Sequence, residues 1–271
     1  MGLYVADMEQ VRAWDPGVPG VAEVFHATFD RHAYPAHTHD RWTLLVVDEG
    51  AVSYDLDRWG HHAAPSRVTI LPPHVPHDGR SARDGHAFRK RVLYLDEDWL
   101  PPPSIAAAVD APTLLRPDLA TTVDQLHQAL AEPGEHLAAE GLLLDVQEAV
   151  TEHLHGARKS EGDDTPLAAR LRALLDDRLA ETVTLDEAST VLGATPRHLS
   201  RCFTRAYGIP PHRYVTGRRI DRARSLLLAG TPTAEVATVT GFHDQPHLTR
   251  HFRRLVGTTP AAFAHPSLVP R

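Results

Sequence analysis

The chain has 271 residues and a mass of 29.8 kDa, which is enough for two domains. Its single cysteine, Cys202, excludes an internal disulfide and a four-cysteine zinc site. No apolar run reaches the roughly 20 residues of a membrane span, and the first residues lack the basic and apolar segments of a secretory signal. These features predict a two-domain protein that stays out of membranes and resides in the reducing cytoplasm.

Short apolar runs separated by turn residues extend from Val21 to Tyr94. The predicted strands are Ala22–Phe29, Trp42–Val47, Val52–Leu56, Val68–Leu71 and Arg91–Leu95. Glu49-Gly50 and the segment 58–60 read as turns between them. Several short strands at even spacing predict a β-barrel or a β-sandwich.

Histidine is concentrated in the first 164 residues, which hold 13 of the chain's 19. His37 and His39 are two residues apart, so on a strand both point to one face. His77, on a second strand, could complete a three-histidine site for Zn²⁺ or another divalent metal. The alternative is that these three side chains line the mouth of a pocket or bond backbone carbonyls. His61 and His62 are expected in loops.

Two helical patterns, Thr121–Leu130 and His136–His155, follow the proline-rich stop after Trp99. Their apolar surface exceeds what one small barrel can cover. A homodimer that pairs through these helices is therefore the prediction, and the alternative is that both helices pack on their own barrel.

The segment 156–166 is polar and rich in glycine and aspartate, which predicts a linker between domains at 1–155 and 167–271. Residues 1–164 hold 13 basic and 27 acidic residues, a net charge of −14. Residues 165–271 hold 15 arginines, no lysine and 8 acidic residues, a net charge of +7. A basic domain beside an acidic one indicates contact with nucleic acid, and arginine suits bidentate contacts to phosphate or guanine.

An internal repeat occupies the basic domain. Thr195–Gly208, TPRHLSRCFTRAYG, matches Asp244–Gly257, DQPHLTRHFRRLVG, at an offset of 49 residues. Each copy starts with a helix-capping residue, carries an apolar stripe at helical spacing and ends in glycine. A shorter helical stripe and a glycine turn precede each copy. The repeat therefore predicts two helix-turn-helix units, each with its second helix in a major groove.

The outward faces of the two recognition helices carry residue types that bond base edges or phosphates. The candidates are Arg197, Ser200, Arg201 and Arg205 on the first helix and Gln245, His247, Arg250 and Arg254 on the second. Arg205 and Arg254 lie farther along and are expected at phosphates or acidic partners. The alternative for any one arginine is a solvated helix face.

A rigid helix is predicted at Pro211–Ala229, between the two units. At 1.5 Å per residue it would span roughly 28 Å. Successive major grooves on one face of DNA lie about 34 Å apart, so such a spacer can hold the two units in adjacent grooves.

The C-terminal 100 or so residues resemble the DNA-binding domain of the AraC/XylS family of transcription regulators. The resemblance is carried by the TPRHLSRCF run, by RRIDRARSLL at Arg218–Leu227 and by the tail Val236–Phe263. It implies an all-α domain with tandem helix-turn-helix units that binds double-stranded promoter DNA. Pro246 departs from the pattern by replacing a side chain that often helps to read the site.

The N-terminal half resembles the cupin-like effector domain that precedes the DNA-binding domain in many such regulators. PAHTHD at Pro35–Asp40 and LPPHVPH at Leu71–His77 carry this weaker likeness. It implies a small-molecule effector pocket, with the candidate lining His37, His39, Trp42, Tyr54, Trp59 and His77. The glutamate that commonly follows the His-x-His pair in metal-binding cupins is absent.

The combined expectation is a multidomain protein of α and β type: a cupin-like β-barrel with a helical dimerisation segment, then the all-α domain. Its function would be sequence-specific regulation of transcription under control of the effector, with RNA polymerase as a partner if it activates. The alternative is a metal-dependent cupin enzyme, which only the histidines support.

Overall fold

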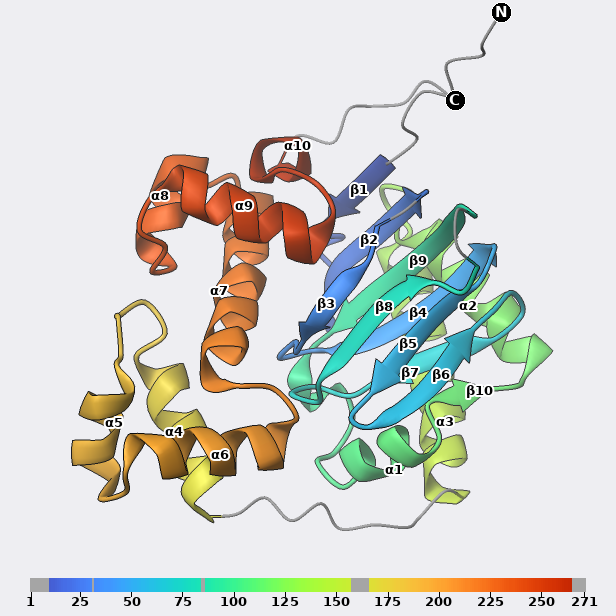
Figure 1. Cartoon of the computed structure of the whole chain (residues 1–271). Coiled ribbons are helices and arrows are strands. Elements are labelled where there is room, and N and C mark those ends of the chain that lie inside the picture. Colours follow the sequence, from blue (N-terminus) through green and yellow to red (C-terminus); the bar gives the residue numbers. More distant parts are fainter. Residues whose placement is uncertain (1–9, 31, 84–85, 157–165, 265–271) are drawn as a thin grey trace, which may run out of the picture.

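The computed structural model describes residues 10–30, 32–83, 86–156 and 166–264 (Figure 1). A β-rich N-terminal domain with helices precedes an all-helical C-terminal domain, as the sequence predicts. The expected linker at 156–166 lies outside the described residues except for Gly156 and Pro166. No helix in the described ranges combines the length and apolarity needed to cross a membrane.

Two antiparallel sheets form the N-terminal domain. One has six strands in the order β1-β2-β9-β4-β7-β10, and the other has four in the order β3-β8-β5-β6. The strands are β1 Gln10–Trp14, β2 Val21–Phe29, β3 Tyr34–His37, β4 Trp42–Glu49, β5 Val52–Leu56, β6 Trp59–Ala63, β7 Val68–Leu71, β8 His77–Ser81, β9 Phe88–Leu95 and β10 Thr113–Leu114. The sheets pack face to face over a shared apolar core.

Strand β4 shows why the predicted run Trp42–Val47 is apolar without alternating polar residues. Leu45 and Val47 face the interior between the sheets, whereas Trp42 and Leu44 belong to a second core on the outer face of the six-stranded sheet. Successive side chains point to opposite faces of a strand, and here both faces are buried.

Helices cover that outer face. They are α1 Ser104–Asp110, after the short 3₁₀ helix Glu97–Trp99, α2 Pro117–Ala129 and α3 His136–Gly156. Leu126 and Val150 are completely buried against the sheet. The two long helices therefore form as predicted and pack on their own domain, yet Leu137 and Leu144 of α3 remain 82% and 65% exposed.

The C-terminal domain consists of seven helices in the described residues: α4 Pro166–Asp177, α5 Leu185–Leu192, α6 Pro196–Tyr207, α7 Pro211–Leu228, α8 Thr233–Val239, α9 Gln245–Val256 and α10 Pro260–Ala264. The side chain of Thr195 accepts from the backbone N–H of His198, and Asp244 caps α9 in the same way at 2.7 Å. Gly208 and Gly257 end α6 and α9 in the left-handed conformation that favours glycine.

The sequence predictions miss several short elements. Trp59 begins β6 instead of lying in a turn, and His61 and His62 lie in β6 instead of a loop. This strand is at the edge of its sheet and mostly exposed, so its sequence lacks the apolar signal on which the prediction relied. Helices α1, α4 and α10 and strands β1 and β10 are also unpredicted, whereas β3 and β8 were expected only as the strands that carry His37 and His77, without bounds.

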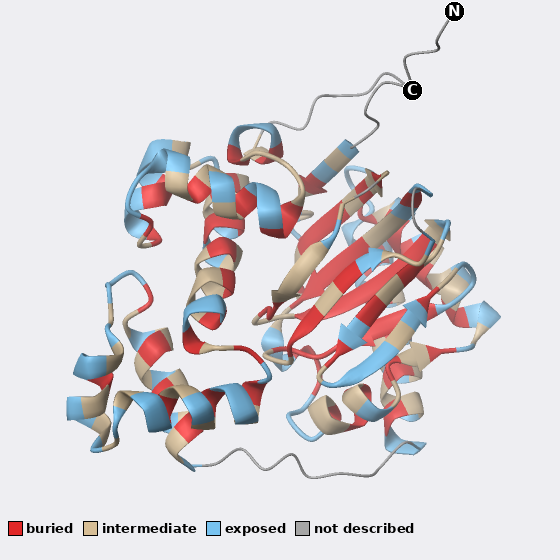
Figure 2. Ribbon diagram, viewed as in Figure 1, coloured by how far each residue is buried: buried red, intermediate tan, exposed pale blue. Residues whose placement is uncertain are grey.

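The two helix-turn-helix units pack against different partners, and α9 lies beside the sheets (Figure 2). The first packs on α4 in a core of its own, around Leu171 and Phe203. The second shares a continuous core with the interior of the sheets, in which Phe252 of α9 joins Phe25 and Phe29 of β2. The end of α9 approaches so closely that a Cβ at Gly257 would lie 2.5 Å from the Phe29 ring.

Candidate effector cavity and DNA-binding surface

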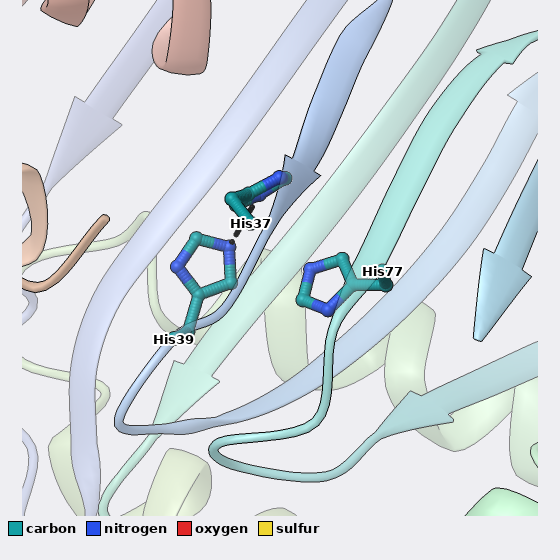
Figure 3. Close-up of side chains that lie close together, drawn as sticks. All are labelled: His37, His39 and His77. Atoms are coloured by element: carbon teal, nitrogen blue, oxygen red, sulfur yellow. Dashed lines mark hydrogen bonds between the residues drawn. The ribbon is translucent and has the colours of Figure 1, made fainter. Parts of the chain in front are cut away.

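Three predicted site residues, His37, His39 and His77, converge between the sheets (Figure 3). His37 ends β3 and pairs across the sheet with His77, which begins β8. His39 lies just after β3 and not on it, but its Nε2 is 3.2 Å from the Nε2 of His37. One ring nitrogen from each of the three lies within 4.8 Å of the others, and all three side chains are buried.

The opposite ring nitrogen of each histidine has an acceptor. The Nδ1 of His37 lies 2.7 Å from the carbonyl oxygen of Pro35, and that of His77 lies 3.1 Å from the carbonyl of Val75. The Nδ1 of His39 lies 2.8 Å from Oδ1 of Asp221, which belongs to α7. Carbonyl and carboxylate oxygens only accept, so each Nδ1 carries a proton and donates it.

Burial sets the charge of the cluster. Burial, together with the other histidines, holds the pKa of His37 well below its usual value and lowers the pKa of His77 to about 3. Both rings are therefore neutral at pH 7. Burial also lowers the pKa of Lys90 to about 7, and its ammonium lies 4.0 Å from the centre of the Tyr34 ring.

The three histidines line a small cavity with a volume of about 50 Å³. Tyr54 lines it as predicted, and Tyr34, Lys90 and Tyr94 are lining residues that the sequence analysis missed. Lys90 and Tyr94 are an even number of residues apart on β9, so both point to the same face of the sheet. Assigning which residues of that strand face inward would have identified both. The cavity wall also includes Leu255 of α9, a residue of the DNA-binding domain.

Two predicted lining residues do not reach the cavity. Trp42 points to the opposite face of β4, where it is buried under the helices and donates its indole N–H to the carbonyl of Glu97. Trp59 is 69% exposed on the edge strand β6. Both predictions treated an aromatic as pocket-lining without fixing which face of its strand it occupies.

Charged contacts join α7 to the N-terminal domain beside the histidine cavity. Arg218 lies 2.6 Å from Asp40, and Arg224 forms a buried ion pair with Glu23 of β2. Burial disfavours charge on Arg224, but the Glu23 carboxylate outweighs burial and raises the pKa of that guanidinium. Arg224 is therefore charged, and this ion pair ties α7 to the N-terminal domain in addition to apolar packing.

The candidate DNA-binding residues of α6 are largely accessible. Arg197, Arg201 and Arg205 are exposed, and Ser200 is half-buried. Figure 1 shows α6 and α9 at opposite ends of α7, which contains 18 residues.

The candidates on α9 have three different surroundings. Gln245 and Arg250 line an exposed hollow together with Arg253. His247 is half-buried against the rings of Phe242 and His251. Arg254 points the other way, into a hollow that it shares with Pro35 and His37 of the N-terminal domain.

Comparison with known proteins agrees with this architecture. Residues 188–265 match a family model described as a helix-turn-helix domain, and residues 19–146 match one described as an AraC-like ligand binding domain. The crystal structure of ToxT from Vibrio cholerae O395 has the same fold, with a TM-score of 0.60 at 12% identity, over 95% of this chain and 96% of that one.

Two relatives extend over both domains. The arabinose operon regulatory protein of Escherichia coli (strain K12) is 30% identical over 225 residues, which cover 73% of this chain and 72% of that protein. The uncharacterized HTH-type transcriptional regulator YbfI of Bacillus subtilis (strain 168) is 27% identical over 79% of this chain and 81% of its own length. The cupin-enzyme alternative is therefore set aside, and the chain belongs to the AraC family of transcriptional regulators, which are not enzymes.

Proposed function

We propose that this regulator binds promoter DNA sequence-specifically and that a small effector in the cavity between its sheets controls the binding. The observation that carries the proposal is the composition of the cavity wall. Leu255 of α9 lines the cavity, and Asp221 of α7 holds one of the lining histidines. An effector there lies against residues that belong to, or are bonded to, the DNA-binding domain.

Control follows from differential affinity. An effector that prefers the docked arrangement of α7 and α9 shifts the population toward it, and by linkage DNA and effector change each other's affinity by the same factor. Typical coupling free energies of about 1–3 kcal/mol correspond to roughly 5- to 150-fold changes in affinity.

The proposed reading faces are Arg197, Ser200, Arg201 and Arg205 of α6 and Gln245, His247 and Arg250 of α9. The remaining candidate, Arg254, lines the hollow toward the N-terminal domain and is expected to contribute little to DNA affinity. The exposed arginines on both helices support the assignment. A helix of 18 residues is about 27 Å long, which is near the 34 Å between successive grooves on one face of the duplex.

Selection of bound sequences from random DNA tests the function. The selected site should lose about 5- to 150-fold in affinity with Arg201→Ala and with Arg250→Ala at matched salt. Arg67→Ala is the control, because Arg67 is exposed in the N-terminal domain and its removal changes the net charge equally. Failure to enrich any sequence, or equal losses for all three variants, would refute the proposal.

We also propose a homodimer that pairs through the outer face of α3. Leu137 and Leu144 are seven residues apart on this helix, so they share one face, and both are exposed. Light scattering at micromolar concentration should give twice the chain mass, and Leu137→Glu with Leu144→Glu should give the chain mass. A monomeric native protein would contradict the pairing.

A further inference from the structure

We propose that the cluster of His37, His39 and His77 binds one divalent transition-metal ion of the zinc class, and that this ion is the effector. Asp221 of α7 would carry the signal to the DNA-binding domain. The identity of the site rests on its own geometry, whereas the role as effector rests on the proposed function above.

The spacing of the His37 and His39 nitrogens fits a metal. Two imidazole nitrogens bound to one tetrahedral zinc ion at 2.0–2.1 Å each lie about 3.3 Å apart. The Nε2 atoms of His37 and His39 are 3.2 Å apart. Since both rings donate from Nδ1, these two Nε2 atoms present lone pairs to each other, which repel unless a cation lies between them.

The partners of the outer nitrogens also fit a metal. Histidines that bind metals almost always donate their other ring N–H to a carboxylate or a backbone carbonyl, which fixes the tautomer and aims the free nitrogen. His37 and His77 donate to carbonyls and His39 to a carboxylate. All three rings are thus held in the form that a metal requires.

The size of the cavity favours an ion over an organic effector. Pockets for small organic ligands occupy about 300–1,000 Å³. About 50 Å³ is available here, which suits a metal ion with a water molecule at its fourth position. Imidazole ligands suit zinc, copper, iron and nickel, and do not suit magnesium or calcium.

The link to the second helix-turn-helix unit is the bond between His39 and Asp221. A metal on Nε2 withdraws charge from the ring, so Nδ1–H becomes a stronger donor to the carboxylate. Asp221 lies three residues from Arg224, whose ion pair with Glu23 ties the same helix to the six-stranded sheet. Metal binding therefore strengthens the docking of α7, and releasing the metal loosens it.

Titration of Zn²⁺ into chelator-stripped full-length protein, in competition with a chromophoric chelator, tests the site. One ion should bind per chain, and Co²⁺ in its place should give the intense visible bands of tetrahedral coordination. His39→Ala and His77→Ala should each weaken binding at least 100-fold, with an unchanged circular dichroism spectrum as the check on folding. His62→Ala, an exposed histidine of β6, should bind like the native protein.

Three results overturn the site: no ion bound by the native protein, loss of the ion with His62→Ala, or retention of it in both His39→Ala and His77→Ala. A proton shared between His37 and His39 would then be the occupant. The native protein alone can overturn the proposal, so it does not depend on the folding of any variant.

Asp221→Ala tests the coupling. It should weaken Zn²⁺ binding by about 10- to 100-fold and, at saturating Zn²⁺, abolish the change in DNA affinity that Zn²⁺ causes in the native protein. If native protein binds its selected DNA equally with and without bound Zn²⁺, the ion is not the effector. DNA binding without any Zn²⁺ binding refutes this inference and leaves the regulator intact. Zn²⁺ binding without DNA selection refutes the regulator and leaves the site intact.

Discussion

The two helix-turn-helix units share a sequence repeat but differ in what surrounds them. Both recognition helices have 12 residues, a side-chain N-cap and a left-handed glycine at the end. The first unit closes its own core against α4, whereas the second completes the core between the sheets. Local sequence therefore determines the helix-turn-helix unit, while its packing against the two sheets makes the second unit the one that borders the cavity.

The largest effect is expected from breaking that attachment. Arg224→Met leaves the Glu23 carboxylate buried without its partner, which costs about 3–5 kcal/mol in the free energy of unfolding. Urea denaturation followed by tryptophan fluorescence measures the loss, because all four tryptophans lie in the N-terminal domain. The double variant Glu23→Leu, Arg224→Met should recover most of it, and a double variant as unstable as the single one would contradict this account.

Three glycines in the left-handed conformation compare the surroundings of the two units. Replacing any of them with alanine lowers the free energy of unfolding by about 1–2 kcal/mol through backbone strain alone. Gly193 has nothing within 4 Å of an added Cβ, so it measures this strain. At Gly208 the Cβ would meet Pro76 at 3.0 Å, and at Gly257 it would meet the buried Phe29 at 2.5 Å. Crowding adds about 1–3 kcal/mol, so unfolding in urea should rank Gly257→Ala as the most destabilising and Gly193→Ala as the least. The reverse order would mean that the second unit is not docked.

Acid should weaken the N-terminal domain. Burial, helped by Arg91, lowers the pKa of His26 to about 4 and holds that of His127 well below its usual value. The unfolded chain, with histidine pKa values near 6.5, then binds more protons than the folded one, so the free energy of unfolding falls as the pH drops from about 6.5 toward 4. Tryptophan-detected unfolding at pH 7 and pH 5 should show this fall, and His127→Leu should reduce it. An equal fall in the variant would assign the effect to other groups.

The smallest effect distinguishes two neighbouring arginines of α9. Arg253 faces the exposed hollow with Gln245, and Arg254 faces the N-terminal domain. Arg253→Ala should therefore remove roughly the DNA affinity that one phosphate contact contributes. The salt dependence of the affinity should also become shallower. Arg254→Ala should change the affinity by less than about threefold, within the ±0.5 kcal/mol usual for surface substitutions. Equal losses would place both side chains on the DNA.

Much of the fold could be predicted because local patterns determine it. Caps such as Thr195 and Asp244 mark where helices begin, and period-two or fully apolar runs mark the central strands. The His-x-His spacing likewise brought His37 and His39 into one candidate site. These features need only neighbours in sequence.

The remainder depends on contacts distant in sequence. Trp42 was misplaced because a strand buried on both faces gives no sign of which face lines the cavity. Asp221 was missed because its partner His39 is 182 positions away, and nothing in the α7 pattern distinguishes it from a solvated aspartate. Leu255 reads as an ordinary core leucine, and only the docking of α9 makes it part of the cavity wall.

The position of Leu255 has a mechanical consequence. An α-helix with its side chains is only about 10–12 Å across, and this one carries a cavity residue on one side and, two positions earlier, an arginine on the solvent side. Because α9 is a rigid helix, a displacement of its cavity-facing side also rotates or tilts its solvent-facing side. In the proposed function, the cavity-facing side and the DNA-facing side therefore belong to the same twelve-residue helix.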